Sequence, residues 1–426
     1  MKASETVKNY PAERRMYANY VMKNVKNICK NIGPRPSGSD KELEAQKWMA
    51  DELKTTCDEV KIEEFNLHPA AFMGWVQVII FCGTAAAILF FLTHFLPALT
   101  IPFLAIGAVL LAVGIFFVIT EFLFYKETLD PFAKKVTSHN VVAVRKPTGE
   151  TKRRIIYSGH ADSAPEWRFT YWGGPKLVVP SIGGGLFGIF LTFISIVLAL
   201  IFNLTGKADD LATLIWVLSI VCVCFIPLFL FCLLFYDPKH PVEGANDNLT
   251  GCLCSMAVPR YLQDHDIRLE NTEVWVICTG SEEAGLRGAK AFCKAHAKEL
   301  LAEKDVETVF FGLDTVRDFD YMAVYHKDMT GTVRNDPQVS KLIKEGAAIA
   351  GYDLPYKTVT FGSSDAAAIT QGGLKASCFA AMDPAPARYY HTRLDTKDNL
   401  DLKTIEAGVD ICLETLFLFD EKGLDV

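Results

Sequence analysis

Hydrophobic and polar positions divide the chain into two kinds of segment. Residues 71–125 and 177–236 are almost continuously apolar, whereas apolar and charged residues are mixed elsewhere. Each apolar region holds two long runs joined by a short link, "PALT" in the first region and "TGKADD" in the second. Each run could cross a bilayer core of roughly 30 Å, which needs about 20 helical residues. The alternative, a pair of buried hairpins in a soluble core, is disfavoured because core helices rarely run so long without a polar face. The pattern predicts four transmembrane helices in two inserted hairpins, with a kink at Pro227.

The other segments, residues 1–70, 126–176 and 237–426, predict a soluble α/β domain. Two amphipathic helices come first, and Ser39 is a plausible N-cap of the second. Short β-branched or aromatic runs then alternate with helical patterns such as "GLRGAKAFCKAHAKELLAEK" and "SKLIKEGAAIAGY". The predicted strands are "EVKIEEFNL", "SHNVVAVRKP", "RRIIYSGHADS", "EVWVICTGSEE", "TVFFGLDTV" and "KASCFAAMD". This alternation predicts an α/β fold with a mostly parallel mixed sheet sandwiched by helices, whose functional sites form at the carboxyl ends of strands.

Charge and cysteine content restrict the class of partner and the cellular compartment of the protein. The net charge of −7, without a basic block, argues against nucleic acid as a partner. The chain has 12 cysteines and none of them forms a pair at zinc spacing, which indicates a reducing compartment. The segment "MKASETVKNYPAERR" lacks the apolar stretch of a signal peptide, so we expect the segment before the first hairpin to lie in the cytoplasm.

Several polar residues follow the predicted strands. They are His160, Asp162, Asp247, Glu282, Glu283, Asp314 and His391. Taken singly, each has a structural explanation: a hydrogen-bonded core histidine, a turn aspartate, or glutamates that complement a helix dipole after Ser281 as N-cap.

Taken together, these residues predict a metal centre. Two histidines and several carboxylates supply the donors for two zinc-like ions about 3.5–4 Å apart, with one bridging carboxylate and two terminal ligands for each ion. Asp162 follows His160 by two residues, and its carboxylate can hold the imidazole in one tautomer through the ring nitrogen that does not bind metal. Of the adjacent Glu282 and Glu283, one can bind metal while the other takes a proton from water.

The order "HADS", "GANDN", "SEEAGLRG", "LD" and "HT" resembles the co-catalytic zinc aminopeptidases of metallopeptidase family twenty-eight, in the MH clan. "GPRPSGS" and "HNVVA" resemble the same family, so the resemblance covers roughly residues 20–70 and 130–425. It implies that His160 and Asp314 complete one metal site, that Glu283 and His391 complete the other, and that Asp247 bridges the two ions. It also implies Glu282 as general base, Asp162 as the partner behind His160, and a cis peptide after Asp247. The departure from the family is the hairpin inserted between "HADS" and "GANDN".

The expected function is that of a membrane-anchored dinuclear zinc exopeptidase with two Zn²⁺ per chain, acting on N-terminal peptide bonds of peptides. An N-acyl amino acid or another membrane-derived amide is the alternative substrate, and a catalytically silent scaffold is the alternative class. Tyr389 and Tyr390, just before His391, could include an oxyanion donor or could only pack. The oligomeric state stays open.

Charges near the hairpins predict the orientation. Lysines flank the helices on the side of the soluble domain, at Lys126, Lys134, Lys135, Lys176 and Lys239. The links between helices hold only Lys207, next to Asp209 and Asp210. The positive-inside rule therefore places the catalytic domain in the cytoplasm. Because the second hairpin begins shortly after Asp162 and ends just before Asp247, we expect the active-site rim at the membrane surface and hydrophobic peptides as substrates.

Overall fold

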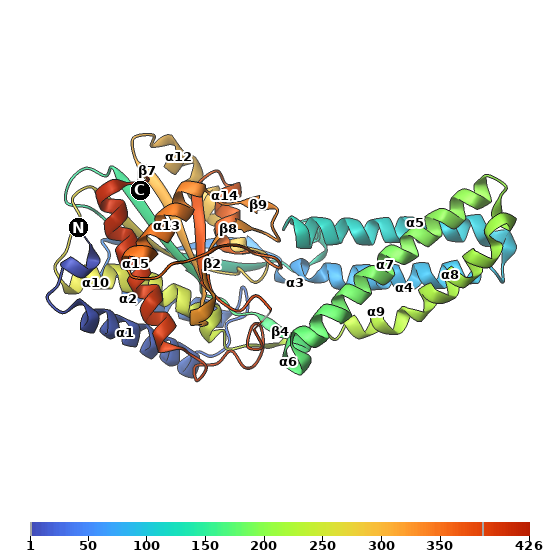
Figure 1. Ribbon diagram of the computed structural model, residues 1–426, viewed down its shortest axis with the longest axis horizontal. Helices are drawn as coiled ribbons and strands as arrows, with labels where there is room; N and C mark the ends of the chain where they lie inside the picture. The colour runs from blue at the N-terminus through green and yellow to red at the C-terminus, as the bar shows by residue number, and fades with distance from the viewer. Residues whose placement is uncertain (1, 386) are drawn as a thin grey trace. The chain divides into compact units, whose positions relative to one another are not determined.

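A computed structural model describes residues 2–385 and 387–426 and divides the chain into two compact units (Figure 1). The first unit comprises residues up to 69, 135–166 and 238–426, and the second comprises residues 70–134 and 167–237. Residues 126–134 and 167–176, which the sequence pattern grouped with the soluble domain, thus lie in the second unit. The reason is local: short helices, η4 (Asp130–Phe132) and α6 (Arg168–Gly173), continue the hairpins beyond their apolar runs.

The first unit is built on one nine-stranded sheet. Its main path is β1 (Glu59–Leu67), β2 (Val136–Arg145), β6 (Thr272–Thr279), β3 (Arg153–His160), β7 (Glu307–Val316), β11 (Lys375–Ala381), β8 (Met322–Asp328) and β10 (Tyr356–Thr358), with β9 (Val333–Arg334) beside β8. The central strands β6, β3, β7 and β11 are parallel to one another, whereas β2 and β8 flank them in antiparallel orientation. The predicted mostly parallel mixed sheet is confirmed.

Helices cover both faces of this sheet because its central strands are apolar on both sides. One continuous core joins alternate side chains such as Tyr157 of β3 and Phe311 of β7 to the surrounding helices. The helices of that core are α1 (Tyr10–Asn31), α2 (Asp40–Leu53), α10 (Gly251–Asp264), α13 (Pro337–Ile349) and α15 (Leu402–Lys422). The remaining helices of this unit include α11 (Arg287–Phe292), α12 (Lys298–Ala302) and α14 (Asp365–Gln371). The Ser39 side chain accepts a hydrogen bond from the Glu42 N–H at 3.2 Å, which confirms it as the N-cap of α2.

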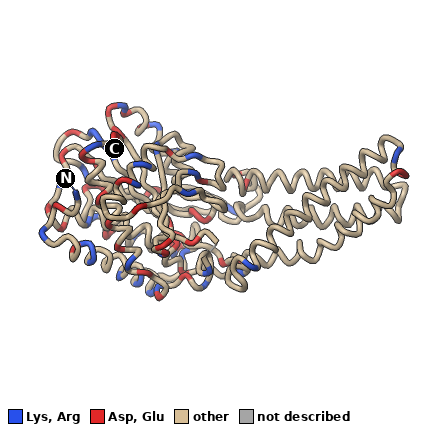
Figure 2. The backbone as a smooth tube through the Cα atoms, viewed as in Figure 1, with Lys and Arg blue, Asp and Glu red and all other residues tan. Residues whose placement is uncertain are grey.

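The second unit contains four helical spans that are long and apolar enough to cross a membrane: Pro69–Leu92, Pro97–Leu123, Pro175–Leu204 and Ala208–Cys232. Lys, Arg, Asp and Glu are scattered over the first unit and nearly absent from these helices (Figure 2). The spans share their own apolar core, which includes Phe90, Leu111 and Ile196. The last span breaks into α8 (Ala212–Cys224) and α9 (Ile226–Cys232), with Pro227 in the first turn of α9, which is where the sequence predicts a kink.

Candidate metal centre

The predicted site residues of the central strands meet at one edge of the sheet. His160 is the last residue of β3, and its register partner Thr279 ends the neighbouring β6. The turn after β6 carries Glu282 and Glu283, and Asp314 lies near the end of β7. Because β6, β3 and β7 are parallel neighbours, their carboxyl ends deliver these side chains to the same place.

Asp247 and His391 reach the site from outside the sheet. Asp247 lies in η6 (Ala245–Thr250), which leads into α10, the helix that packs on β3, and the peptide bond to Asn248 is cis, as the resemblance implies. The close approach of α10 depends on Gly159 in β3, where a Cβ atom would lie 2.4 Å from the Cys252 backbone nitrogen. His391 lies between β11 and α15 with a φ of 52°.

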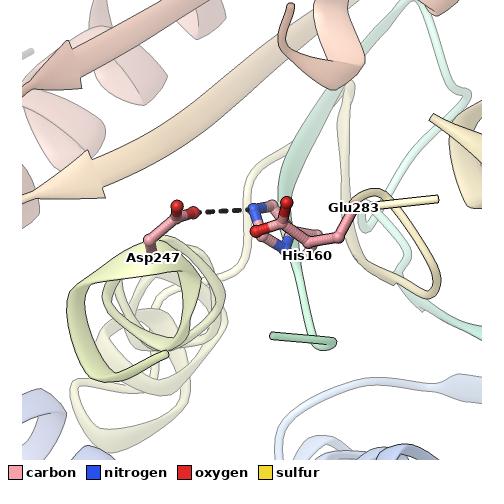
Figure 3. Close-up of side chains that lie close together, drawn as sticks. All are labelled: His160, Asp247 and Glu283. Atoms are coloured by element: carbon pink, nitrogen blue, oxygen red, sulfur yellow. Dashed lines mark hydrogen bonds and ion pairs between the residues drawn. The ribbon is translucent and has the colours of Figure 1, made fainter. Parts of the chain in front are cut away.

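Asp247 stands between the two histidines. Its Oδ1 lies 3.0 Å from His160 Nε2, and its Oδ2 lies 3.0 Å from His391 Nε2. His391 Nε2 is also 3.2 Å from Glu283 Oε1. Figure 3 shows the Asp247 and Glu283 side chains converging on His160, and one ligand atom from each of these three residues lies within 4.8 Å of the others. One carboxylate thus has an oxygen for each imidazole.

Asp314 and Glu282 complete the cluster. Asp314 lines a small cavity of about 10 Å³ together with His160, and burial and the charge of Asp247 raise the pKa of Asp314 to about 7. Glu282 Oε2 lies 3.9 Å from His160 Nε2. All the side chains proposed from the sequence as ligands or base therefore gather in one buried place.

The electrostatics of this cluster call for a cation. Burial, reinforced by neighbouring carboxylates, raises the pKa of Glu282 and of Glu283 above the ordinary value. Burial by itself would lower the pKa of His391, but the charges of Glu283 and Asp247 outweigh it and raise that pKa to about 10. Among the described residues, Asp247 Oδ2 and Glu283 Oε1 are buried acceptors that lie close to His391 Nε2 but receive no hydrogen bond of good geometry. Buried, unsatisfied carboxylate oxygens beside imidazoles fit a zinc site.

Asp162 supports both halves of the centre. Its Oδ1 lies 3.3 Å from His160 Nδ1 and accepts the Glu282 N–H at 3.0 Å. Its Oδ2 accepts the Glu283 N–H at 3.1 Å and the Ser37 hydroxyl at 2.7 Å. The next helix, α11, begins only at Arg287, so the explanation of the two glutamates as helix-dipole residues after an N-cap is wrong. Their N–H groups are bound by a carboxylate from another strand end.

Two further carboxylates shape the site and were missed in the sequence. Glu42 of α2 accepts the Ser281 N–H at 2.6 Å, and burial raises the pKa of Glu42 to about 8. Asp395 accepts the N–H groups of Asn246 and Asp247 at 2.8 and 3.1 Å, which ties the His391 loop to the Asp247 loop. Both act on backbone groups. Neither falls on a strand end, and the only signal for Asp395 was its place four residues after His391.

Arg35, from the "GPRPSGS" segment, joins the two loops that carry His160 and Asp247. Its side chain is fully buried and donates to the carbonyl oxygens of Ala161 at 2.7 Å, Glu243 at 2.7 Å and Gly244 at 3.0 Å. Residues 167–237 are inserted between these loops. The guanidinium therefore holds the two loops together within the first unit.

Tyr390 packs against His391, with the rings stacked at 3.9 Å and an interplanar angle of 24°. Burial and then the charges of Asp247, Glu283, Asp314 and Glu282 raise its pKa well above the ordinary value. The Tyr390 ring thus lies against one of the proposed ligands. Tyr389 points elsewhere, since its hydroxyl donates to Asp318 at 2.9 Å.

The chain is similar to known zinc enzymes. Residues 235–416 match the model of peptidase family M28. BSAP, a zinc aminopeptidase from Bacillus subtilis, is 15% identical with a TM-score of 0.55, and 94% of each chain is covered. An aminopeptidase from Aneurinibacillus sp. strain AM-1 is 16% identical with a TM-score of 0.53 and 93% coverage of each chain. A glutaminyl cyclase from Bacteroides thetaiotaomicron is 14% identical with a TM-score of 0.54, covering 94% of this chain and 97% of that one.

No curated protein sequence matches the chain significantly. The predicted resemblance to the family is confirmed by the match over residues 235–416, and the fold is one that zinc aminopeptidases and glutaminyl cyclases share.

Proposed function

We propose that this chain, which carries the M28 peptidase fold, is a membrane-anchored zinc exopeptidase that hydrolyses N-terminal peptide bonds with two ions per chain. The observation that carries the proposal is the position of Asp247, whose two oxygens lie 3.0 Å from His160 and 3.0 Å from His391. A carboxylate placed between two imidazoles in this way suits a ligand shared by two ions.

The proposed ligands form two sets. His160 and Asp314 would hold one ion, Glu283 and His391 would hold the other, and Asp247 would be shared. Zinc ions bound there polarise the scissile carbonyl and lower the pKa of a water molecule. Asp162 keeps His160 oriented and, through the N–H groups of residues 282 and 283, keeps the glutamate turn in place.

Glu282 is the proposed general base. It is buried next to His160, and its backbone N–H donates to Asp162, which fixes the residue in the turn. Its carboxylate would take a proton from the attacking water and pass it to the leaving amine.

Tyr390, stacked on His391, is the proposed hydrogen-bond donor to the oxyanion. Steady-state kinetics of Tyr390→Phe should show kcat lowered by about 10²–10³ with little change in KM.

Cyclisation of a glutaminyl residue is the second candidate, because a glutaminyl cyclase matches the fold with a TM-score of 0.54. Cyclisation releases ammonia and consumes no water, so it needs no base that activates water. The attacking amine of a cyclisation must still lose a proton and the ammonia must gain one, so Glu282, 3.9 Å from His160, suits either reaction. The match of residues 235–416 to a peptidase family favours hydrolysis.

Reporter amides separate these reactions. We would assay the full-length protein in phosphatidylcholine vesicles with a leucyl amide, its N-acetyl counterpart and a peptide that begins with glutamine, each with and without chelator. The proposal expects chelator-sensitive release from the free leucyl amide only. Preference for the N-acetyl amide would indicate an N-acyl hydrolase, ammonia release without cleavage would indicate a cyclase, and a zinc-free inert chain would indicate a scaffold.

The proposed location follows from the spans and the charges around them. Four spans return the chain to its starting side, and the lysine-rich ends of the hairpins adjoin the segments of the catalytic domain. We therefore place the catalytic domain in the cytoplasm and propose hydrophobic peptides as substrates.

A further inference from the structure

Arg393, two residues after His391, binds Glu166 with three donors. Its Nε and Nη2 donate to Glu166 Oε1 and Oε2 at 2.7 and 2.5 Å, and its backbone N–H donates to Oε1 at 3.2 Å. A guanidinium that binds both oxygens of a carboxylate fixes the relative orientation of the two side chains as well as the distance between them. The contact therefore holds the main chain beside His391 as well as the side chain of Arg393.

Glu166 is buried although Arg393 is not. The Glu166 side chain is 1% exposed, whereas that of Arg393 is 59% exposed. A buried carboxylate needs its partner far more than an exposed guanidinium does. Glu166 is also the last residue of the first unit before the chain passes into the second. The loop that carries His391 is thus anchored by Glu166, a residue far from it in the sequence.

The same loop also contacts the returning part of the chain. The Lys397 N–H donates to Glu243 Oε2 at 3.1 Å, and Asp395 accepts the Asp247 N–H at 3.1 Å. On the departing side, Ala164 accepts the Val242 N–H at 2.9 Å, so the departing and returning segments lie side by side. Arg393 supplies the contact of the His391 loop with the departing segment, and residues 395 and 397 supply the contact with the returning one.

We propose that Arg393 is a positioning residue of the metal centre, which holds His391 in place by anchoring its loop to Glu166. This inference rests on the proposed role of His391 as a ligand. Partners outside the immediate ligands typically change metal affinity by about 10–100-fold when removed. Arg393→Met should therefore release zinc at a roughly 10–100-fold lower chelator concentration than the parent protein.

The test is chelator competition on full-length protein in phosphatidylcholine vesicles, with zinc retention as the readout. Arg393→Lys keeps the charge but loses the paired geometry, so we expect retention between that of the parent and that of Arg393→Met. The Glu166→Gln, Arg393→Met double variant should be no worse than Arg393→Met, because both changes break the same contact. Arg14→Met is the matched control: Arg14 contacts Glu406 at 3.0 Å and Asp410 at 2.6 Å, on helices α1 and α15.

Parent-like retention in Arg393→Met, or additive losses in the double variant, would overturn the proposal. An equal loss in Arg14→Met would also overturn it, because the effect would then be general destabilisation. If Arg393→Met does not fold, Arg393→Lys decides the question by the same measurement. Zinc retention does not depend on catalysis, so a parent protein that binds zinc but cleaves no reporter would refute the proposed function and leave this inference standing.

Discussion

Glu282 and Glu283 are adjacent in the chain but face different histidines. Glu283 Oε1 lies 3.2 Å from His391, whereas Glu282 Oε2 lies 3.9 Å from His160. Glu282→Gln removes the proton acceptor and keeps the volume of the side chain. We expect its rate to fall by about 10²–10⁴ while zinc content stays near that of the parent, as measured by turnover and elemental analysis. Full activity, or loss of zinc, would reassign the base.

Asp247→Ala, unlike Glu282→Gln, should lose zinc. A shared ligand serves both ions, and its loss leaves each ion with two protein donors where four-coordinate zinc normally has three or four. We expect both ions to be lost, measured as zinc per chain after dialysis. Near-normal zinc content would remove Asp247 from the centre of the site.

Sequence reasoning located side chains that follow apolar runs, such as His160 and Asp314, at the correct edge of the sheet, because a strand end places its polar residue at a known edge. Their role as ligands stays a prediction. It failed for Arg35 and Glu42, whose partners include backbone groups far away in the chain. It also misjudged Ser281, which has a φ of 54° and precedes a turn instead of a helix. Backbone partners leave no periodic pattern in the sequence.

The packing of α10 against β3 sets the place of Asp247. A Cβ at Gly159 would lie 2.4 Å from the Cys252 nitrogen and 2.5 Å from the Gly251 carbonyl carbon, so helix and strand would have to separate. Gly159→Ala should lower the free energy of unfolding by about 1–3 kcal/mol and weaken zinc binding, measured by thermal unfolding and chelator competition.

Gly312 in the neighbouring β7 is the matched control. A Cβ there would find its nearest neighbour, Phe310, at 3.5 Å, which is ordinary contact. Gly312→Ala should therefore leave zinc binding nearly unchanged. Equal effects of the two substitutions would show that the approach of α10 does not set the metal centre.

Strands were predictable where apolar residues ran continuously or alternated with polar ones, and the alternating segment "EVKIEEFNL" coincides with β1 (Glu59–Leu67). The seven-residue β8 (Met322–Asp328) was not identified. The short β10 (Tyr356–Thr358) and β9 (Val333–Arg334) were also missed, because two or three residues carry no measurable period. These strands exist through pairing with β8, which is a tertiary effect.

For the whole molecule, the proposed orientation gives a direct prediction. A cysteine placed at Asp209, exposed in the polar "TGKADD" segment where the last span begins, should react with an impermeant maleimide on intact cells. A cysteine placed at exposed Lys298 in α12 should react only after the membrane is permeabilised. The parent chain, with its own free thiols, provides the background. The reverse pattern would place the catalytic domain outside the cytoplasm.

The insertion between His160 and Asp247 also sets the order in which the membrane spans and the proposed ligands are synthesised. The ribosome delivers His160 before the spans Pro175–Leu204 and Ala208–Cys232, and it delivers Asp247, Glu283, Asp314 and His391 after them. If the spans lie in the bilayer and the ligands are as proposed, a nascent chain whose last two spans are being inserted contains only one of the proposed ligands, His160. Zinc loading of the complete centre can then begin only after both spans and the last proposed ligand, His391, have been synthesised.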